Sequence, residues 1–357
     1  MSNLPPEYSP PEYPPPPRQP STAGTAQAAG VLTAPTLGQR LSALGRQFAG
    51  TERLALIVAL ILLFVLMTVL SPGKFLRPVN MMNIALAISV TGLVAIAETI
   101  VMISGGLDVS VSAIVGLASV AAALGVNATG SWMGGVAAGL TMGVLAGSVN
   151  GGLITKGRMN PVITTLATVS VFSGMAYIIT KGQAVGVSND AFNSIGNGRI
   201  YGIPIPVMIL IVVAVAGTIF LNRMDWGRNI YAIGGNPNAA RLAGINLNRY
   251  KMGIYMLCGL ICGLAAVIVT GRTNSGIPTQ TQTDLNFQAI TAAVLGGTAL
   301  AGGKGTLVGT LLGVLIIGTL NNAMIILGVQ TFYQMLARGL LLIFAVLFQE
   351  WQFQRRR

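Results

Sequence analysis

The chain has 357 residues, of which 53% are apolar and only 8% are charged. Because soluble globular domains carry about 25% charged residues, this composition excludes an ordinary soluble domain. The net charge of +12 would suit a nucleic-acid-binding protein. However, the basic residues are spread over short segments between apolar runs, which is typical of membrane orientation signals. Several apolar runs approach the length of about 20 residues that crosses a bilayer as a helix. We therefore predict an all-α polytopic membrane protein.

The first 53 residues precede these apolar runs. Residues 1–37 hold ten of the seventeen prolines and are predicted to be a disordered, Pro-rich cytoplasmic tail. Residues 38–53 form a basic juxtamembrane segment with Arg40, Arg46 and Arg53. The apolar run 54–70 lacks a small-residue cleavage site, so we interpret it as an uncleaved first span rather than a signal peptide.

Ten spans are predicted within a transmembrane domain over residues 54–349. After 54–70 they cover approximately 80–103, 108–126, 132–153, 161–180, 203–221, 251–270, 285–301, 306–326 and 332–349. With a cytoplasmic N-terminus, fifteen Lys and Arg residues lie on that side and five on the other, namely Lys74, Arg77, Lys181, Arg199 and Arg272. The positive-inside rule thus places both termini, including the basic end 350–357, in the cytoplasm. The loop 180–199 is the longest on the outer face.

A short internal similarity relates two of the spans. Gly143–Asn150 (GVLAGSVN) resembles Gly313–Asn321 (GVLIIGTLN) if one inserted residue is allowed. In the predicted topology the first segment runs inward and the second outward. Similar segments in opposite directions are what an inverted-repeat transporter would contain, so we predict such a repeat.

The sequence contains no recognisable catalytic constellation. It has no histidine, and its two cysteines, Cys258 and Cys262, lie one turn apart in one apolar segment, which excludes a disulfide framework and makes a poor metal site. The segment Gly296–Thr306 is not a phosphate-binding loop, because Lys304 is followed by glycine and apolar spans replace the expected strand. We expect a chain that is not an enzyme and that binds no metal or cofactor itself.

Two acidic residues lie within or beside apolar runs. An acid at the hydrocarbon depth costs roughly 2.5–3.5 kcal/mol, so Glu98 is expected to face the protein interior. It would either border a translocation cavity or make a structural hydrogen bond to a neighbouring helix. Asp108 follows the Gly105-Gly106 break, and Asp108 or Ser110 would either cap the next helix or lie at a gate along the path.

The longest polar interruption is Trp226–Gly244, within a loop that covers residues 222–250. Asn236 followed by Pro237 is a helix-start signature, and Gly244 is a stop signal, so a short helix with small residues is predicted between them. Such a helix with basic flanks suits docking into a groove of another protein. The alternative is an ordinary cytoplasmic loop.

Four segments in order resemble permease subunits of ATP-binding-cassette importers of the ribose and simple-sugar type, from about residue 75 to 348. Ala239, Ala240 and Gly244 match the Glu-Ala-Ala…Gly pattern of the coupling loop, with Asn238 in place of Glu. Gly106, Asp108, Ser110 and Val111 match Gly-Gly-Ile-Asp-Leu-Ser-Val. The segment opened by Asn160-Pro161 resembles a family segment that begins Pro-Phe-Ile-Val-Thr. The segment 296–305 resembles Gly-Gly-Thr-Ser-Leu-Ser-Gly-Gly-Arg-Gly, and Asn321-Asn322 downstream also match.

This resemblance implies a multi-pass permease in a bacterial inner membrane that imports a monosaccharide or polyol. The implied partners are an ATPase that holds ATP and Mg in two nucleotide-binding domains, fused in one chain or on separate chains, a second permease chain forming a homodimer or heterodimer, and an extracytoplasmic solute-binding protein. The implied ATPase-coupling residues are Gly235, Asn236, Pro237, Asn238, Ala239, Ala240, Arg241 and Gly244. The candidate path or gate residues are Glu98, Gly106, Asp108, Ser110, Asn321 and Asn322. The alternative is a secondary carrier or channel for a small polar solute that needs no ATPase.

Overall fold

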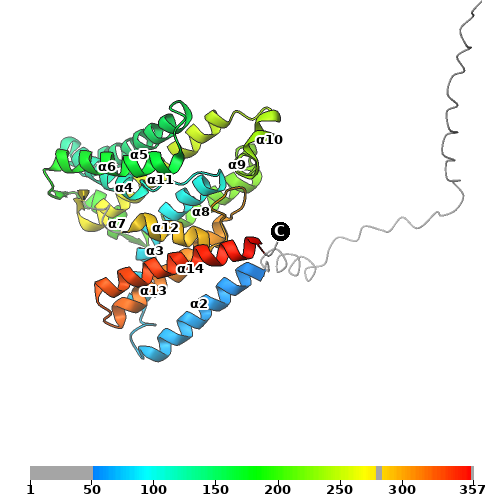
Figure 1. Cartoon of the computed structure of the whole chain (residues 1–357). Helices are drawn as coiled ribbons and strands as arrows, with labels where there is room; N and C mark the ends of the chain where they lie inside the picture. The colour runs from blue at the N-terminus through cyan, green and yellow to red at the C-terminus, as the bar shows by residue number, and fades with distance from the viewer. Residues whose placement is uncertain (1–50, 279–283, 355–357) are drawn as a thin grey trace, which may run out of the picture. The chain divides into compact units, whose positions relative to one another are not determined.

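The computed structural model of the chain describes residues 51–278 and 284–354. Within these ranges the protein is almost entirely helical (Figure 1). The predicted Pro-rich tail, most of the basic segment 38–53 and the three C-terminal arginines lie outside the described residues. Eight described helices are long and apolar enough to cross a membrane. They are α2 (Thr51–Leu70), α3 (Pro78–Ile103), α4 (Val111–Thr129), α5 (Trp132–Thr155), α6 (Pro161–Thr180), α8 (Ile205–Arg223), α11 (Leu247–Thr273) and α13 (Leu307–Ile326). The predicted all-α polytopic membrane fold is confirmed.

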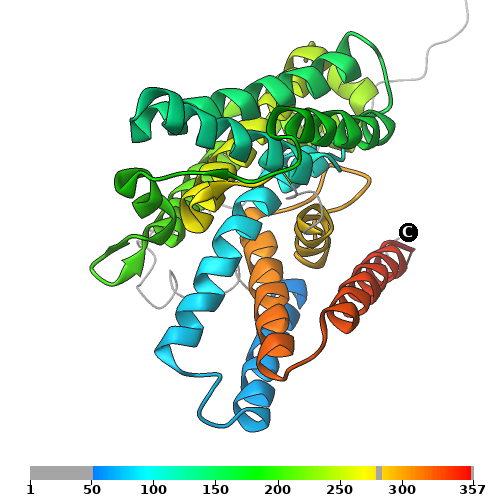
Figure 2. The same ribbon diagram turned by 90° about the vertical axis from the view of Figure 1, so that its left-hand side faces the viewer.

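Two further apolar helices complete the set of about ten. They are α12 (Leu285–Leu295) and α14 (Thr331–Gln354). The predicted span 285–301 was wrong at its end, because the helix stops before Gly296-Gly297. At 1.5 Å per residue, the 11 residues of α12 rise about 16 Å, roughly half of the bilayer's hydrocarbon core. Figure 2 shows α12 as a short helix next to α13 and α14, and it packs against both.

The remaining elements are short and lie between the spans. They are α7 (Asp190–Asn197), α9 (Asp225–Gly235), α10 (Pro237–Leu242) and the strands β1 (Val185–Gly186), β2 (Arg199–Ile200), β3 (Ile203–Pro204) and β4 (Ser275–Gly276). β1 pairs with β4, and β2 pairs with β3, both antiparallel. The predicted outer loop 180–199 therefore contains a helix and two strands. The predicted span 108–126 begins later, at Val111, because Asp108, Val109 and Ser110 belong to the preceding loop.

The core of the described protein is formed by α3, α4 and α11. In the most apolar 18-residue stretch of α3, 78% of the residues are buried, whereas only 6% are buried in the corresponding stretch of α2. α2 is therefore peripheral. The outward faces of α2, α6 and α8 expose many large apolar side chains, such as Val69, Ile178 and Val212. Because lipid tails are as apolar as these side chains, such faces are stable only in a bilayer or against another membrane chain.

The contact between α5 and α11 is made by glycines. Five glycines recur at every fourth residue of α5, from Gly135 to Gly151, and therefore lie on one face of that helix. A Cβ atom at Gly263 would lie 2.7 Å from the Gly139 carbonyl oxygen, and the Gly143 and Gly259 backbones touch in the same way. Small residues at this spacing let two membrane helices approach until their backbones meet.

α11 connects two ends of the bundle. Its 27 residues rise about 40 Å, from Leu247 beside α10 to Thr273 beside α7. At the α7 end, Asn197 donates a hydrogen bond of 2.8 Å to the Gly271 carbonyl, and Phe192 packs into a small cluster with Val126 and Val267. At the other end lie α9, α10 and the loops that follow α3 and α12 (Figure 1).

Candidate functional site

The predicted short helix in the loop 222–250 is present as α10, and its first turn is fixed by local sequence. The Asn236 side chain accepts hydrogen bonds from the backbone N–H groups of Asn238 (3.1 Å) and Ala239 (3.0 Å). These two groups have no partner inside the helix, so asparagine at this position stabilises the helix start. Pro237 occupies the first helical position, where its missing N–H costs nothing.

The end of α10 is equally local. Gly244 has a φ of +83°, a left-handed conformation that glycine adopts without strain. The N–H of Gly244 bonds to the Arg241 carbonyl, and that of Ile245 to the Ala240 carbonyl, both at 3.0 Å. This pair of bonds is the Schellman motif, which satisfies the last carbonyls of a helix. Both predicted ends of the helix are confirmed.

The two alanines of the predicted coupling motif face in different directions. Ala240 is buried and packs with Ile233 of α9 and Leu247 of α11. Ala239 is exposed, as are Arg241 and Leu242. An inward Ala240 seats α10 on the bundle, which leaves the opposite face of α10 available to a partner.

Leu242 is the residue that sequence reasoning missed on this face. Its side chain is 90% exposed, although it is a large apolar residue in a polar loop. Covering this side chain with a partner would remove apolar surface from water, although a single exposed leucine does not by itself mark an interface. The signal in the sequence was a single leucine between Arg241 and Ala243, two residues after the Ala239-Ala240 pair.

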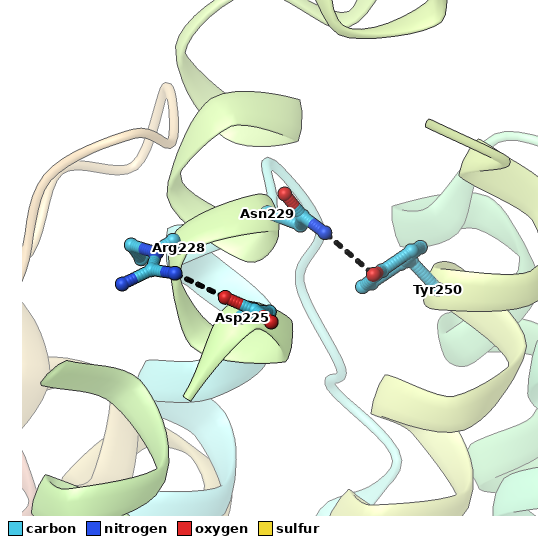
Figure 3. A network of polar contacts seen from close by, with 4 residues as sticks. All are labelled: Asp225, Arg228, Asn229 and Tyr250. Carbon is cyan, nitrogen blue, oxygen red and sulfur yellow. Dashed lines mark hydrogen bonds and ion pairs between the residues drawn. The ribbon is translucent and has the colours of Figure 1, made fainter. Parts of the chain in front are cut away.

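α9, which precedes α10, is held against α11 through side-chain contacts. Figure 3 shows Asn229 pointing towards Tyr250, to whose hydroxyl it donates a hydrogen bond of 2.6 Å. The rings of Trp226 and Tyr250 pack with their centroids 4.5 Å apart. Arg228 forms an ion pair with Asp225 within α9 (Figure 3), and because both side chains are exposed, this pair adds little stability.

Four of the predicted path residues lie together in the interior. Asp108 donates its backbone N–H to Glu98 Oε1 at 3.1 Å, and its own carboxylate accepts from the Ser110 N–H (2.9 Å) and hydroxyl (2.5 Å). Asn150 of α5 donates to the Ser110 hydroxyl at 2.8 Å and to Asp108 at 3.3 Å. Gly106 lies against Tyr255 of α11, whose hydroxyl would be 2.7 Å from a Cβ atom there. We call Glu98, Asp108, Ser110, Asn150 and Tyr255 the buried polar cluster.

The buried polar cluster is closed to solvent within this chain. Glu98, Asp108, Ser110 and Asn150 have no exposed surface, and Tyr255 is 1% exposed. Ser110 stands at the helix-start position of α4, but its side chain bonds to Asp108 and caps no N–H of the helix. Three polar atoms have no hydrogen-bond partner, namely Glu98 Oε2, Asn150 Oδ1 and the Tyr255 hydroxyl. Glu98 accepts its hydrogen bond from the loop that precedes α4 and not, as predicted, from a neighbouring helix, and a role for the cluster in the path stays a prediction.

The two remaining path candidates lie elsewhere, on α13. Asn322 and Asn80 of α3 exchange two amide hydrogen bonds, at 2.8 and 3.0 Å. Asn321 donates to Gln288 of α12 at 3.1 Å and lines a cavity of about 370 Å³ between α12, α13 and α14. An ion pair between Arg338 and Asp284, at 3.5 Å, also lines this cavity.

A metal site within residues 51–278 and 284–354 would need side-chain groups of the kind that hold metal ions in proteins. No group of three or more His, Cys, Asp or Glu side chains is arranged there to hold an ion. Cys258 and Cys262 are buried free thiols, and the Cys258 Sγ atom lies 3.9 Å from an Asp108 carboxylate oxygen. The cysteines therefore contribute to packing around the buried polar cluster.

Comparison with known proteins gives matches along most of the chain. Residues 80–346 match the family described as the permease component of the branched-chain amino acid transport system. The ribose import permease protein RbsC of Bacillus subtilis is 43% identical over 298 residues, which cover 83% of this chain and 92% of that protein. RbsC of Escherichia coli K12 is 40% identical over 295 residues, covering 82% of this chain and 91% of RbsC.

A second kind of relative is named for another sugar. The L-arabinose transport system permease protein AraH of Escherichia coli K12 is 39% identical over 306 residues, covering 86% of this chain and 93% of AraH. No solved structure matches the chain. The match to the family covers more than half of the chain, and it coincides with the helices that form the membrane domain. The chain is therefore a multi-pass membrane transport permease that belongs to the family of branched-chain amino acid transport system permease components.

Proposed function

We propose that this chain is the membrane-spanning subunit of an ATP-driven importer for a monosaccharide such as ribose or L-arabinose, or for a related polyol. The observation that carries this proposal is the 39–43% identity to permeases named for ribose and arabinose over more than nine tenths of their lengths. A substrate among the branched-chain amino acids, as the family description would allow, is disfavoured by these relatives. The membrane is expected to be a bacterial inner membrane, because the relatives are bacterial permeases.

ATP hydrolysis is expected on a partner ATPase, which would bind ATP and Mg, and not on this chain. The proposed docking surface for that partner is the outer face of α10 with Asn238, Ala239, Arg241 and Leu242. Its support is geometric, since α10 is capped at both ends, seated by Ala240 and exposed on the other face. A short rigid helix with one apolar anchor suits insertion into a groove.

Two more partners complete the proposed assembly. A second permease chain, identical or related, would cover one of the exposed apolar helix faces described above. An extracytoplasmic binding protein would deliver the solute to the end that carries α7. The buried polar cluster would reach the solute only after the helices around it rearrange, because its side chains have no exposed surface in the present conformation.

The competing function is a secondary carrier that needs no ATPase. An ion-coupled carrier would be expected to hold paired intramembrane charges. In the described chain, Glu98 with Asp108 fits this expectation best, and the half-buried Arg338–Asp284 ion pair is a further candidate. The burial of Glu98 and Asp108 without a visible path to either end favours a structural role over ion coupling. The high identity to import permeases favours the ATP-driven function.

Reconstitution tests the two functions directly. The permease is purified from its native cell in mild detergent, identified with its accompanying subunits by mass spectrometry, and placed in vesicles. We expect an ATPase at fixed stoichiometry and uptake of labelled ribose or L-arabinose that requires ATP and the binding protein, with labelled leucine as the control solute. Accumulation of a sugar by the chain alone, without ATP, would establish the carrier instead.

A further inference from the structure

Three double glycines that are far apart in the sequence meet at one place beside α10. They are Gly105-Gly106 after α3, Gly234-Gly235 at the end of α9, and Gly302-Gly303 in the loop between α12 and α13. One backbone hydrogen bond joins two of these segments, from the Gly303 N–H to the Ile103 carbonyl at 2.8 Å. We call this meeting point the glycine junction.

The backbones at the glycine junction touch with no side chain between them. A Cβ atom at Gly234 would lie 2.5 Å from the Gly303 nitrogen and closer still to the Ile103 carbonyl oxygen. A Cβ atom at Gly303 would lie 2.7 Å from the Gly235 Cα, and one at Gly302 would lie 2.8 Å from the Gly105 Cα. Real Cβ atoms do not approach other atoms this closely, so each contact requires glycine.

The glycine junction lies between α10 and the interior. Gly235 is followed directly by Asn236, which caps α10. On the other side, Gly106 touches the Tyr255 hydroxyl, and two residues later Asp108 enters the buried polar cluster. A displacement of α10 would therefore reach the loop before α4 and the loop before α13 through direct backbone contact.

A side-chain contact reinforces the same route. The Tyr231 hydroxyl of α9 donates to the Gly305 carbonyl at 2.9 Å. Burial raises the pKa of Tyr231 above its ordinary value, and the charge of Arg53 opposes this only in part, so the phenol keeps its proton and remains a donor at neutral pH. A second route leaves α9 in the opposite direction, from Asn229 to Tyr250 of α11. The two routes can be separated by substitution.

We propose that the glycine junction positions the loops before α4 and α13 relative to α10, and that it transmits the movement of α10 to the membrane helices during transport. This inference rests on the proposed ATP-driven function. Packed backbones have discrete arrangements and do not deform continuously, so a shift on one side of such a contact displaces the segment on the other side. The route through Tyr250 would then serve to hold α9 in place.

The decisive experiment compares Gly234→Ala with Gly174→Ala in the reconstituted complete transporter. Both changes add one methyl group to a helical glycine, but the added Cβ at Gly174, in α6, would meet no atom within 4 Å. The quantity measured is the number of solute molecules transported per ATP hydrolysed. We expect Gly234→Ala to lower this ratio at least tenfold while hydrolysis continues, and Gly174→Ala to change it by less than twofold.

A second pair of variants tests the glycine junction even if the Gly234→Ala chain fails to fold or to assemble with its partners. Tyr231→Phe removes only the hydrogen bond to the Gly305 carbonyl, whereas Tyr250→Phe removes only the bond from Asn229. We expect Tyr231→Phe to lower the transport-to-hydrolysis ratio at least threefold and Tyr250→Phe to leave it unchanged. A purely structural role of Tyr231 would lower transport and hydrolysis together and leave the ratio intact.

The outcomes separate this inference from the function on which it rests. If Gly234→Ala or Tyr231→Phe transports as well per ATP as its control, the glycine junction is not the route, and the ATP-driven function stands. If Tyr250→Phe alone lowers the ratio, transmission runs through α11 and the inference is overturned. If the unaltered chain transports without ATP, both the proposed function and the inference fail.

Discussion

Glu98 Oε1 accepts the backbone N–H of Asp108 at 3.1 Å, ten residues further along the chain and across the break between α3 and α4. Both residues have no exposed surface. A buried N–H needs an acceptor, and removing that acceptor costs about 1–3 kcal/mol, in addition to any cavity left behind. Glu98 thus fixes the conformation of the loop that carries Asp108 and Ser110, two of the residues that match the sugar-permease motif.

The first prediction concerns this acceptor. Glu98→Ala is expected to destabilise the purified protein by about 2–4 kcal/mol, because the Asp108 N–H loses its partner and a cavity opens. Glu98→Gln keeps an acceptor oxygen and should stay within about 1 kcal/mol of the original chain. Thermal unfolding in detergent measures both. If Glu98→Gln also transports normally, the hypothesis that the carboxylate contacts the solute loses its support.

The second prediction concerns the Tyr255 hydroxyl. This group is buried and has no hydrogen bond of good geometry, although the Leu107 backbone lies beside it, so its desolvation is poorly compensated. Tyr255→Phe removes the hydroxyl and keeps the ring, and we expect the stability to be unchanged or raised by about 1 kcal/mol. Thermal unfolding in detergent measures this difference in stability as well. A loss of more than about 1 kcal/mol would mean that the hydroxyl has a partner in the working protein, such as a bound water.

The third prediction concerns Leu242, the exposed apolar residue of the proposed docking surface on α10. Leu242→Asp should leave the stability of the free permease unchanged, because the side chain is 90% exposed. It should weaken binding of the partner ATPase by about 2 kcal/mol, or roughly 30-fold, as expected for an apolar anchor at an interface. Leu242→Met is the matched control. Equal binding of all three forms in a pull-down titration would remove Leu242 from the docking surface.

The fourth prediction separates the two alanines of the coupling motif. Ala240→Leu inserts bulk against Ile233 and Leu247, and overpacking of this kind costs about 1–3 kcal/mol even without a partner. Ala239→Leu points into solvent and should act only when the ATPase is bound. Stability is measured on the free permease and uptake on the complete transporter. The assignment of the two faces would be wrong if Ala239→Leu were the variant that destabilised the free chain.

The local features were predictable from the sequence, and the reason is visible at α10. Its ends depend on Asn236, Pro237 and Gly244, whose effects act over four or five residues. The membrane fold was predictable for the same kind of reason, since a run of about 20 apolar residues has few alternatives in water or lipid.

The features that the sequence could not show depend on contacts between distant segments. The double glycines at 105, 234 and 302 each resembled an ordinary break or turn, and only the fold brings them together. The predicted span 285–301 failed because hydropathy averages over Gly296-Gly297, where the helix ends. The predicted path residues divided between the buried polar cluster and α13, because a motif match gives the residue types without their neighbours.

The glycine contact between α5 and α11 has a consequence for where the protein can change shape. Two backbones in direct contact leave no side chains that could switch rotamers to absorb a sliding movement. The two helices are therefore expected to move as one rigid body. This pair also contacts α3, α4, α6 and α7, and alternating access would have to open along one or more of those contacts.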